Sequence, residues 1–383
     1  MPVSSVRVKV VRAGVVGVLA VVLALLGLAV SPARTVAAEK APARGKALAG
    51  GKAPAGGNAP ARGKAPAGAL KNEPVAGVQI AVSCLSASLC VLVGYNERSV
   101  GDVVALRAGL PGHVSTVAQL SGIFSVSCPA KSGCVALGDQ AGVGARFVVV
   151  NSSGVVKSTK LVAVPAGVTL TRIACTKLTA CEVTGTDIFV TPEAIELGSW
   201  NGSSLKLHRL SSPKGISDAA VEGISCFGGG CDVVGYFDKG ATVTGFVLTT
   251  KDGKPGRLQS VPGDSLYGVS CVSATRCYSA GYTETGGLVL TLNGGKASAP
   301  QHVKPDLMSI ACSGASCTAA GEQLPPPSSP DAFWGALVDV SAGKVTSTQS
   351  VAPSGGFSGV ARSGAFFAAV GAAQKAQSEV TTG

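Results

Sequence analysis

Twelve cysteines fall into six close pairs that recur along the chain at a nearly constant spacing. The first members of successive pairs are 44, 47, 51, 45 and 41 residues apart, so the repeating unit is about 45 residues long. Every pair sits among short apolar runs, as in VSCLSASLCVLVGY at 82–95 and VSCVSATRCYSAGY at 269–282. A repeat of this length made of short strands is typical of one blade of a β-propeller. The pairs are Cys84/Cys90, Cys128/Cys134, Cys175/Cys181, Cys226/Cys231, Cys271/Cys277 and Cys312/Cys317.

The strands of one blade are clearest in the fifth unit, where apolar or alternating runs are separated by turns rich in Gly and Asn. Its four expected strands lie at 266–271, 276–283, 287–293 and 296–303. A seventh unit at 360–371 keeps the pattern without cysteines, with Phe366 at the place of the second cysteine. We therefore predict an all-β fold, a seven-bladed β-propeller. The ring would be closed either by its own last strands or by the segment at 74–81.

Each cysteine pair is predicted to be a disulfide that staples the hairpin between the first two strands of its blade. The first cysteine would end one strand and the second would begin the next, within the Cα separation that a disulfide requires. A zinc site would need four converging ligands, and the three histidines, His113, His208 and His302, fall in different units. We therefore predict no metal and no cofactor. Paired cysteines in this number indicate an oxidising compartment.

The N-terminal part of the chain has the features of an export signal followed by a linker. Basic residues at 7, 9 and 12 precede the apolar run 13–30, and small residues at 36–38 offer a cleavage site, so we predict a signal peptide at 1–38. Residues 39–73, rich in Ala, Pro, Gly and Lys, should form an extended linker. The propeller is expected at 74–383. The mature chain has no second apolar stretch long enough to span a membrane, so we predict a secreted, extracellular or cell-wall-associated protein.

The net charge of +11 does not belong to the predicted propeller. Residues 1–38 hold four basic side chains and no acid, and residues 39–71 hold seven basic side chains and one acid, which leaves 21 basic against 20 acidic side chains in 72–383. A nucleic-acid-binding protein would carry its basic patch on the folded domain. We therefore exclude nucleic acid as a partner.

Each repeat begins with Val or Ile, then Ser or Ala, then the first Cys. The second Cys follows after four or five further residues, and a Gly follows after three more. This unit resembles the cysteine-paired repeats of secreted actinobacterial seven-bladed propellers, which are similar to Asp-box (BNR) and photosystem II assembly factor-like propellers. The resemblance covers residues 74–383. It implies the fold rather than an activity, because propellers include enzymes, lectins and scaffolds. Only the front half of an Asp box remains, at 250–253, and Trp200 and Trp334 do not lie at the matching place.

No catalytic arrangement stands out in the sequence. A sialidase of this kind would need an Arg-Ile-Pro string, and the nearest one, at 171–174, lacks the proline. Another glycosidase would need two facing carboxylates, and nothing local singles out a pair. We also find no nucleophile elbow and no unpaired cysteine. We predict no catalytic residues.

An acid follows the repeat glycine within three residues in all six cysteine-bearing units. The turns between second and third strands all open on one face of a propeller, opposite the disulfide hairpins. We therefore expect a ring of carboxylates at one mouth of the central channel, which would bind a cation or a basic segment, including the chain's own Lys- and Arg-rich linker. The alternative is that exposed turns simply favour acids. The six acids are Glu97, Asp139, Asp187, Asp238, Glu284 and Glu322.

A second candidate on the same face is the long loop at 322–334, which contains three consecutive prolines. Such a run adopts the polyproline II shape that partner grooves recognise, or it is only a stiff surface loop.

Together these features predict a secreted, non-catalytic binding or scaffold propeller that recognises an extracellular protein or a charged envelope polymer. We expect a monomer. Two alternatives stay open: a carbohydrate-binding lectin, which should show aromatic platforms, and a sialidase-like glycan-processing enzyme, which should show a carboxylate pair near the channel mouth.

Overall fold

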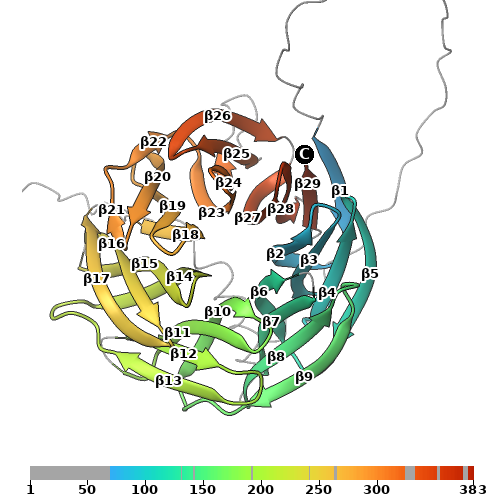
Figure 1. Ribbon diagram of the computed structural model, residues 1–383, viewed down its shortest axis with the longest axis horizontal. Coiled ribbons are helices and arrows are strands. Elements are labelled where there is room, and N and C mark those ends of the chain that lie inside the picture. The colour runs from blue at the N-terminus through green and yellow to red at the C-terminus, as the bar shows by residue number, and fades with distance from the viewer. Residues whose placement is uncertain are drawn as a thin grey trace, which may run out of the picture. The chain divides into compact units, whose positions relative to one another are not determined.

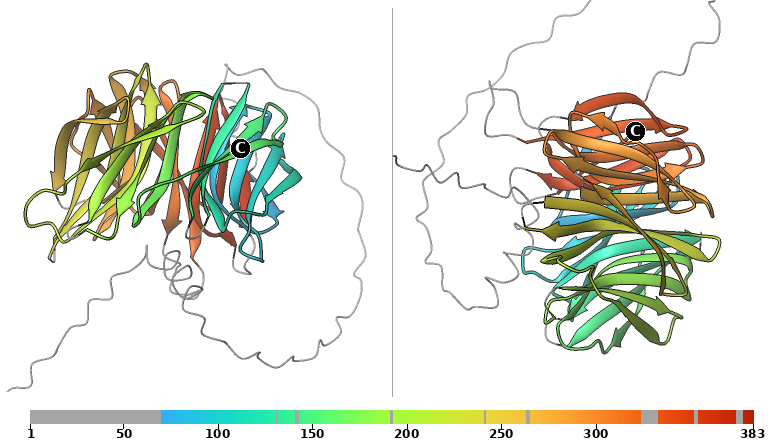
Figure 2. Two further views of the ribbon diagram at one scale, coloured as in Figure 1. Left: turned by 90° about the horizontal axis from the view of Figure 1, so that it is seen from below. Right: turned by 90° about the vertical axis from the view of Figure 1, so that its left-hand side faces the viewer.

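Seven antiparallel sheets follow one another round a ring, which confirms the predicted seven-bladed β-propeller (Figure 1). The computed structural model describes residues 70–130, 132–140, 143–190, 193–240, 242–262, 265–323, 333–351, 354–373 and 378–383. The predicted signal peptide, and all of the predicted linker before residue 70, lie outside the described residues, as does most of the proline-rich loop. In the side views the sheets stand beside one another, with strands running between the two faces of the ring (Figure 2).

In the first six blades the strands pair in chain order, and the first strand of each lies nearest the centre (Figure 1). The first three blades comprise β2 (Val78–Ser86), β3 (Leu89–Tyr95), β4 (Gly101–Arg107) and β5 (Leu110–Val117); β6 (Gly122–Ala130), β7 (Gly133–Gln140), β8 (Gly144–Asn151) and β9 (Val156–Val162); and β10 (Val168–Lys177), β11 (Ala180–Asp187), β12 (Ala194–Trp200) and β13 (Leu205–Leu210).

Blades four to six follow the same plan, except that the outer strand of blade five is broken into two short pieces that both pair with β20. They comprise β14 (Asp218–Phe227), β15 (Gly230–Lys239), β16 (Thr242–Lys251) and β17 (Lys254–Pro262); β18 (Ser265–Ser273), β19 (Arg276–Thr283), β20 (Gly286–Asn293), β21 (Lys296–Ala297) and β22 (Gln301–Val303); and β23 (Asp306–Ser313), β24 (Ser316–Gln323), β25 (Trp334–Ser341) and β26 (Lys344–Val351).

Blade seven closes the ring with strands from both ends of the described chain. It consists of β27 (Ser354–Ser363), β28 (Phe366–Ala373), β29 (Ser378–Thr382) and, at the rim, β1 (Lys71–Val75). The chain's last strand and an N-terminal strand both take part, but β1 shares only Pro74 and Val75 with the predicted closing segment 74–81, whose residues 78–81 lie in β2 of blade one. The N-terminal closing strand ends before the predicted segment 74–81 does, because Gly77, at a φ of 74°, turns the chain into β2.

The seventh unit corrects one detail of the sequence alignment. β27 pairs Arg362 with Phe367, the register at which the facing cysteines stand in other blades, and Ser363 with Phe366. The prediction that Phe366 replaces the second cysteine was therefore wrong by one residue: Phe367 holds that place, at the same separation of five residues as in Cys226–Cys231.

All six predicted disulfides are present, and each joins the first strand of its blade to the second. The paired Cα atoms are 3.8–4.0 Å apart, and no cysteine is free. Disulfides in this number indicate an extracellular or otherwise oxidising environment. Among the described residues there is no helix long and apolar enough to cross a membrane. The six bonds are Cys84–Cys90, Cys128–Cys134, Cys175–Cys181, Cys226–Cys231, Cys271–Cys277 and Cys312–Cys317.

The hydrophobic core is divided into seven clusters, one between each pair of neighbouring blades, made mainly of Val, Leu and Ala. The serine before the first cysteine adds a polar link, because its Oγ accepts a hydrogen bond from the backbone of the next blade. These bonds run from Cys128 N to Ser83 (3.1 Å), Cys175 N to Ser127 (2.9 Å), Cys271 N to Ser225 (3.0 Å) and Cys312 N to Ser270 (3.0 Å).

The second cysteine of every disulfide is a core residue, which the sequence did not predict. From the sequence these cysteines were expected only to staple a hairpin, but the structure buries each of them almost completely. The physical reason is their position at the start of the second strand, which lies between the first and third strands of its own sheet and is covered by neighbouring blades. These residues therefore stabilise the fold and offer no surface for binding. They are Cys90, Cys134, Cys181, Cys231, Cys277 and Cys317.

Candidate functional site

A β-bulge occurs at the same place in the first strand of every blade and shapes the end of the ring opposite the disulfides. Each bulge leaves one residue without a partner on the second strand. The seven residues are all different amino acids: Ile80, Phe124, Thr171, Glu222, Tyr267, Met308 and Ser358.

The glycine of the repeat is explained by this bulge. Each glycine pairs with the residue just before the bulged one, and a Cβ there would overlap the carbonyl oxygen of the preceding first-strand residue. Any other side chain would therefore collide with backbone. The glycines are Gly94, Gly138, Gly185, Gly235, Gly281, Gly321 and Gly371.

Three of the five tyrosines gather where blades four and five meet. Tyr267, the bulged residue of β18, stacks on Tyr282 of β19, with ring centroids 4.9 Å apart, and their hydroxyls are hydrogen-bonded at 2.8 Å. Tyr236 of β15 lies on the other side of Tyr267 at 6.1 Å. Burial, and then the charges of nearby acids, raise the pKa of Tyr236.

Acids face acids across the strands on either side of these tyrosines. Asp218 of β14 is directly opposite Asp238 of β15, and Asp306 of β23 is directly opposite Glu322 of β24. Like charges in facing positions destabilise a sheet. Burial, and then the charge of Asp218, raise the pKa of Asp238, one of whose carboxylate oxygens is buried without a hydrogen-bond partner.

Two further acids complete the group. The pKa of Glu193 is raised to about 7, first by burial, then by the charge of Asp218 and a hydrogen bond to it, and last by the charge of Asp187. Glu222, the bulged residue of β14, accepts a hydrogen bond from Arg172 Nη2 at 2.7 Å.

We call these residues the tyrosine–carboxylate arc, since they come from four consecutive blades and act on one another electrostatically. The arc consists of Glu193, Asp218, Glu222, Tyr236, Asp238, Tyr267, Tyr282, Asp306 and Glu322.

Of the six acids expected to form a ring, the structure brings Asp238 and Glu322 into this arc. Asp187 lies beside it, buried at the end of β11, where one carboxylate oxygen is paired with Arg209 and the other accepts the backbone N–H of Phe189. Because its oxygens are already bonded, Asp187 shapes the arc rather than offering it a free charge.

The other three predicted acids lie outside the arc. Glu97 and Glu284 are exposed at the turns of blades one and five, and Asp139 is half-buried at the end of β7, where burial raises its pKa. The sequence placed all six at one repeat position, but they stand one, two or three residues after the glycine, so they differ in orientation. Their role in binding stays a prediction.

Sequence reasoning missed the tyrosines and four of the acids. A signal existed in the Gly-Tyr pairs at 235–236 and 281–282, and in the acids that begin first strands at 218 and 306. Their meeting could not be inferred, because it depends on the register of each bulge.

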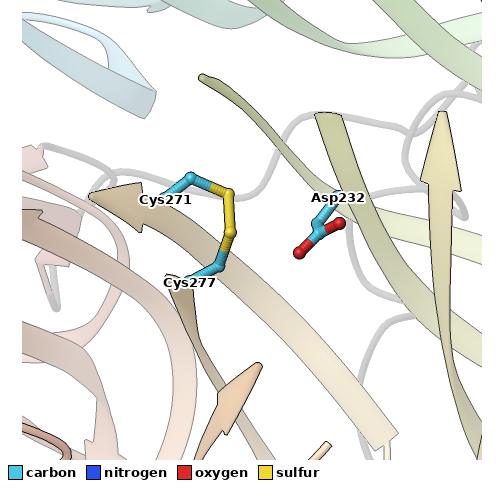
Figure 3. A group of neighbouring side chains, drawn as sticks. All are labelled: Asp232, Cys271 and Cys277. Carbon is cyan, nitrogen blue, oxygen red and sulfur yellow. A yellow bond between two sulfur atoms is a disulfide. The ribbon is translucent and has the colours of Figure 1, made fainter. Parts of the chain in front are cut away.

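One further group of polar side chains lies near the disulfide end of the ring. The carboxylate of Asp232 in blade four and both sulfur atoms of Cys271 and Cys277 in blade five lie within 4.8 Å of one another (Figure 3). Both sulfurs are bonded to each other, so the pair does not supply the thiolates that zinc requires. Burial raises the pKa of Asp232 to about 6.

Two open grooves, of about 450 and 540 Å³, flank the broken outer strand of blade five. His302 lines both, and no acid or tyrosine lines either. They therefore lack the paired carboxylates of a glycosidase. Glu193 and Asp218 of the arc are hydrogen-bonded to each other, which brings their carboxyl groups closer than the separation of about 5–9.5 Å found in glycosidases.

No protein-family model and no curated protein matches this chain. Solved structures with the same fold do match. The structure of YCF48 bound to D1 peptide has a TM-score of 0.51 at 12% identity, over 82% of this chain and 94% of that one. The WD40 repeats of RRP9 match with a TM-score of 0.56 at 13% identity, over 83% and 98%, and U3-55K with 0.53 at 12%, over 81% and 98%. At these identities the matches establish a seven-bladed propeller and no more.

Proposed function

We propose that this protein is a secreted, non-catalytic binding propeller whose tyrosine–carboxylate arc holds a basic segment of a partner protein. The observation that carries the proposal is the pairing of acid against acid, Asp218 with Asp238, beside the stacked tyrosines, with one carboxylate oxygen of Asp238 buried and without a hydrogen-bond partner.

Facing carboxylates repel each other, and burial strengthens the repulsion because less water screens it. A lysine or arginine placed between them would remove this repulsion. The faces of Tyr267 and Tyr236 could hold the same cation through cation–π contacts. The arc contains six acids, and one of them, Glu222, is already paired with Arg172.

The compartment and the fold support the same function. Disulfide-bonded cysteines fit the export signal predicted at 1–38 and a place outside the cell or at its envelope. YCF48 in complex with D1 peptide is a propeller of this fold with a bound peptide. We extend peptide binding to this chain as part of the proposal, in preference to a charged envelope polymer, which would have to be cationic.

The test is binding of a fluorescent oligolysine peptide of about ten residues, followed by anisotropy at low and physiological salt. The double variant Asp218→Asn/Asp238→Asn should lower the affinity about tenfold and flatten its salt dependence. Glu97→Gln/Glu284→Gln removes the same charge from exposed turns outside the arc and serves as the matched control.

Affinity for the peptide should also rise from about pH 6 to about pH 8, because Glu193, with a pKa of about 7, loses its proton over that range and its carboxylate attracts cations. No binding by the unmodified protein, or an equal loss in both double variants, would overturn the arc as the site.

The stacked tyrosines favour one second candidate, a carbohydrate-binding lectin, because aromatic faces and carboxylates also bind sugars. A glycan array on the unmodified protein and on Tyr267→Ala separates the two. Sugar binding that depends on Tyr267, together with no oligolysine binding, would favour the lectin.

A further inference from the structure

Large apolar side chains are exposed mainly at the end of the ring that carries the arc. Nine such side chains are exposed among the described residues, and five of them lie in or beside the turns between second and third strands. These five are Val143, Ile188, Phe189, Val243 and Phe333. Single exposed apolar residues are ordinary, so the position of Ile188, Phe189 and Val243 in blades three and four, which carry acids of the arc, is what requires an explanation.

Phe189 is the most exposed of them, at 73%, yet its loop is held in place by specific contacts. Its backbone N–H donates to Asp187 Oδ1 at 2.9 Å, and the N–H of Ile188 donates to the carbonyl of Gly167 at 3.1 Å. A Cβ on Gly167 would come within 2.6 Å of the Phe189 ring, so the ring rests directly on this glycine. The backbone thus presents an aromatic ring to solvent in a defined position.

The exposed apolar residues of blades three and four border acids of the arc. Val243 is directly opposite Asp238 in the ladder between β15 and β16. Phe189 is bonded to Asp187, whose charge acts on Glu193. We call Ile188, Phe189 and Val243 the apolar crest. Crest and carboxylates therefore form one mixed surface across two neighbouring blades.

We propose that the apolar crest is the hydrophobic half of the binding site, and that the partner segment is amphipathic, with a large aliphatic or aromatic side chain next to its lysine or arginine. This inference rests on the proposed function and specifies its partner. A purely cationic segment would satisfy the carboxylates and leave the crest in water, whereas an amphipathic one buries it. An anionic lipid surface does not fit, because the acids beside the crest would repel it.

The experiment compares two fluorescent peptides of equal length and charge, one alternating Lys with Leu and one alternating Lys with Ser. The unmodified protein should bind the Lys–Leu peptide about tenfold more tightly, which is the effect of burying one large apolar side chain. Phe189→Ser should remove this difference and leave the affinity for the Lys–Ser peptide unchanged. Leu110→Ser, at a residue 55% exposed on β5 of blade one, is the matched control and should change neither affinity.

Three results would overturn the inference. Equal affinity of the unmodified protein for both peptides would exclude the crest and leave the proposed function standing. Binding of neither peptide would remove both. Self-association in sedimentation that Phe189→Ser abolishes would assign the crest to a second copy of the chain. Thermal unfolding of each variant shows whether it is folded, so that a folding defect is not mistaken for a loss of binding.

Discussion

The two ends of each blade are built from the same strands, yet they repeat to different degrees round the ring. At one end, six hairpins carry a disulfide with nearly identical Cα separations, and serine hydroxyls join neighbouring blades. At the other end, seven different amino acids occupy the bulge, and the connection between second and third strands varies from 284–285 in blade five to 324–333 in blade six.

The difference shows where this molecule keeps its stability and where it can vary. The interblade clusters and the disulfides hold the ring together, and the clusters contain none of the seven bulged residues. That end therefore tolerates features that disfavour folding, such as facing carboxylates and an exposed phenylalanine.

The largest effect on stability is expected from Gly281→Ala, at the glycine that recurs at the same position in every blade. The new Cβ would overlap the carbonyl oxygen of Ser265, and backbone cannot move aside cheaply, so we expect a loss of about 3 kcal/mol in the free energy of unfolding. Gly230→Ala is the control, because its Cβ would lie 3.4 Å from the nearest atom, an ordinary contact. Denaturant unfolding measures both, and equal losses would refute the role given to the bulge.

Removing one disulfide should have the next largest effect and should be similar in different blades. The double variants Cys84→Ala/Cys90→Ala and Cys128→Ala/Cys134→Ala open loops of the same length, so each should lose about 2 kcal/mol of stability. Both should keep the oligolysine affinity of the unmodified protein. If the two losses of stability differ by more than about 1 kcal/mol, the two disulfides do not stabilise their blades equally, although their Cα separations are alike.

The smallest effect concerns Asp232, which is an exception at the repeated end. Its pKa is about 6 in the fold against 3.8 when unfolded, so the folded state favours the protonated form. The stability that protonation provides is complete below about pH 4 and is lost as pH rises through 6.

Asp232→Asn should therefore be more stable than the unmodified protein at pH 8, with a weaker decline of stability between pH 4 and pH 8. Some decline should persist, because burial also raises the pKa of Asp102 to about 6. Denaturant unfolding across this pH range is the measurement, and Glu97→Gln, at an exposed turn, is the control. A variant as pH-sensitive as the parent would show that Asp232 is not the group responsible.

The blades and their disulfide hairpins could largely be predicted from the sequence, because the contacts that define them are local. The cysteines of a pair are five or six residues apart, so their spacing alone indicates a hairpin disulfide. The period of about 45 residues gives the blade, and seven units give the ring. Even the misplacement of Phe366 is a shift of one position inside a correctly predicted hairpin. The burial of the second cysteines was missed because it depends on the neighbouring blades rather than on the hairpin.

The candidate site could not be predicted in the same way, because its residues meet through the ring. Glu193 and Glu322 belong to one arc although they lie in blades three and six, and Tyr267 reaches Tyr236 of the neighbouring blade because a bulge leaves it out of the ladder. A shift of one residue in a strand turns each side chain to the other face. The sequence by itself determined the blade, its disulfides and their number. Only the tertiary structure decided which acids and tyrosines face one another, because bulge register and the order of blades lie beyond any local pattern.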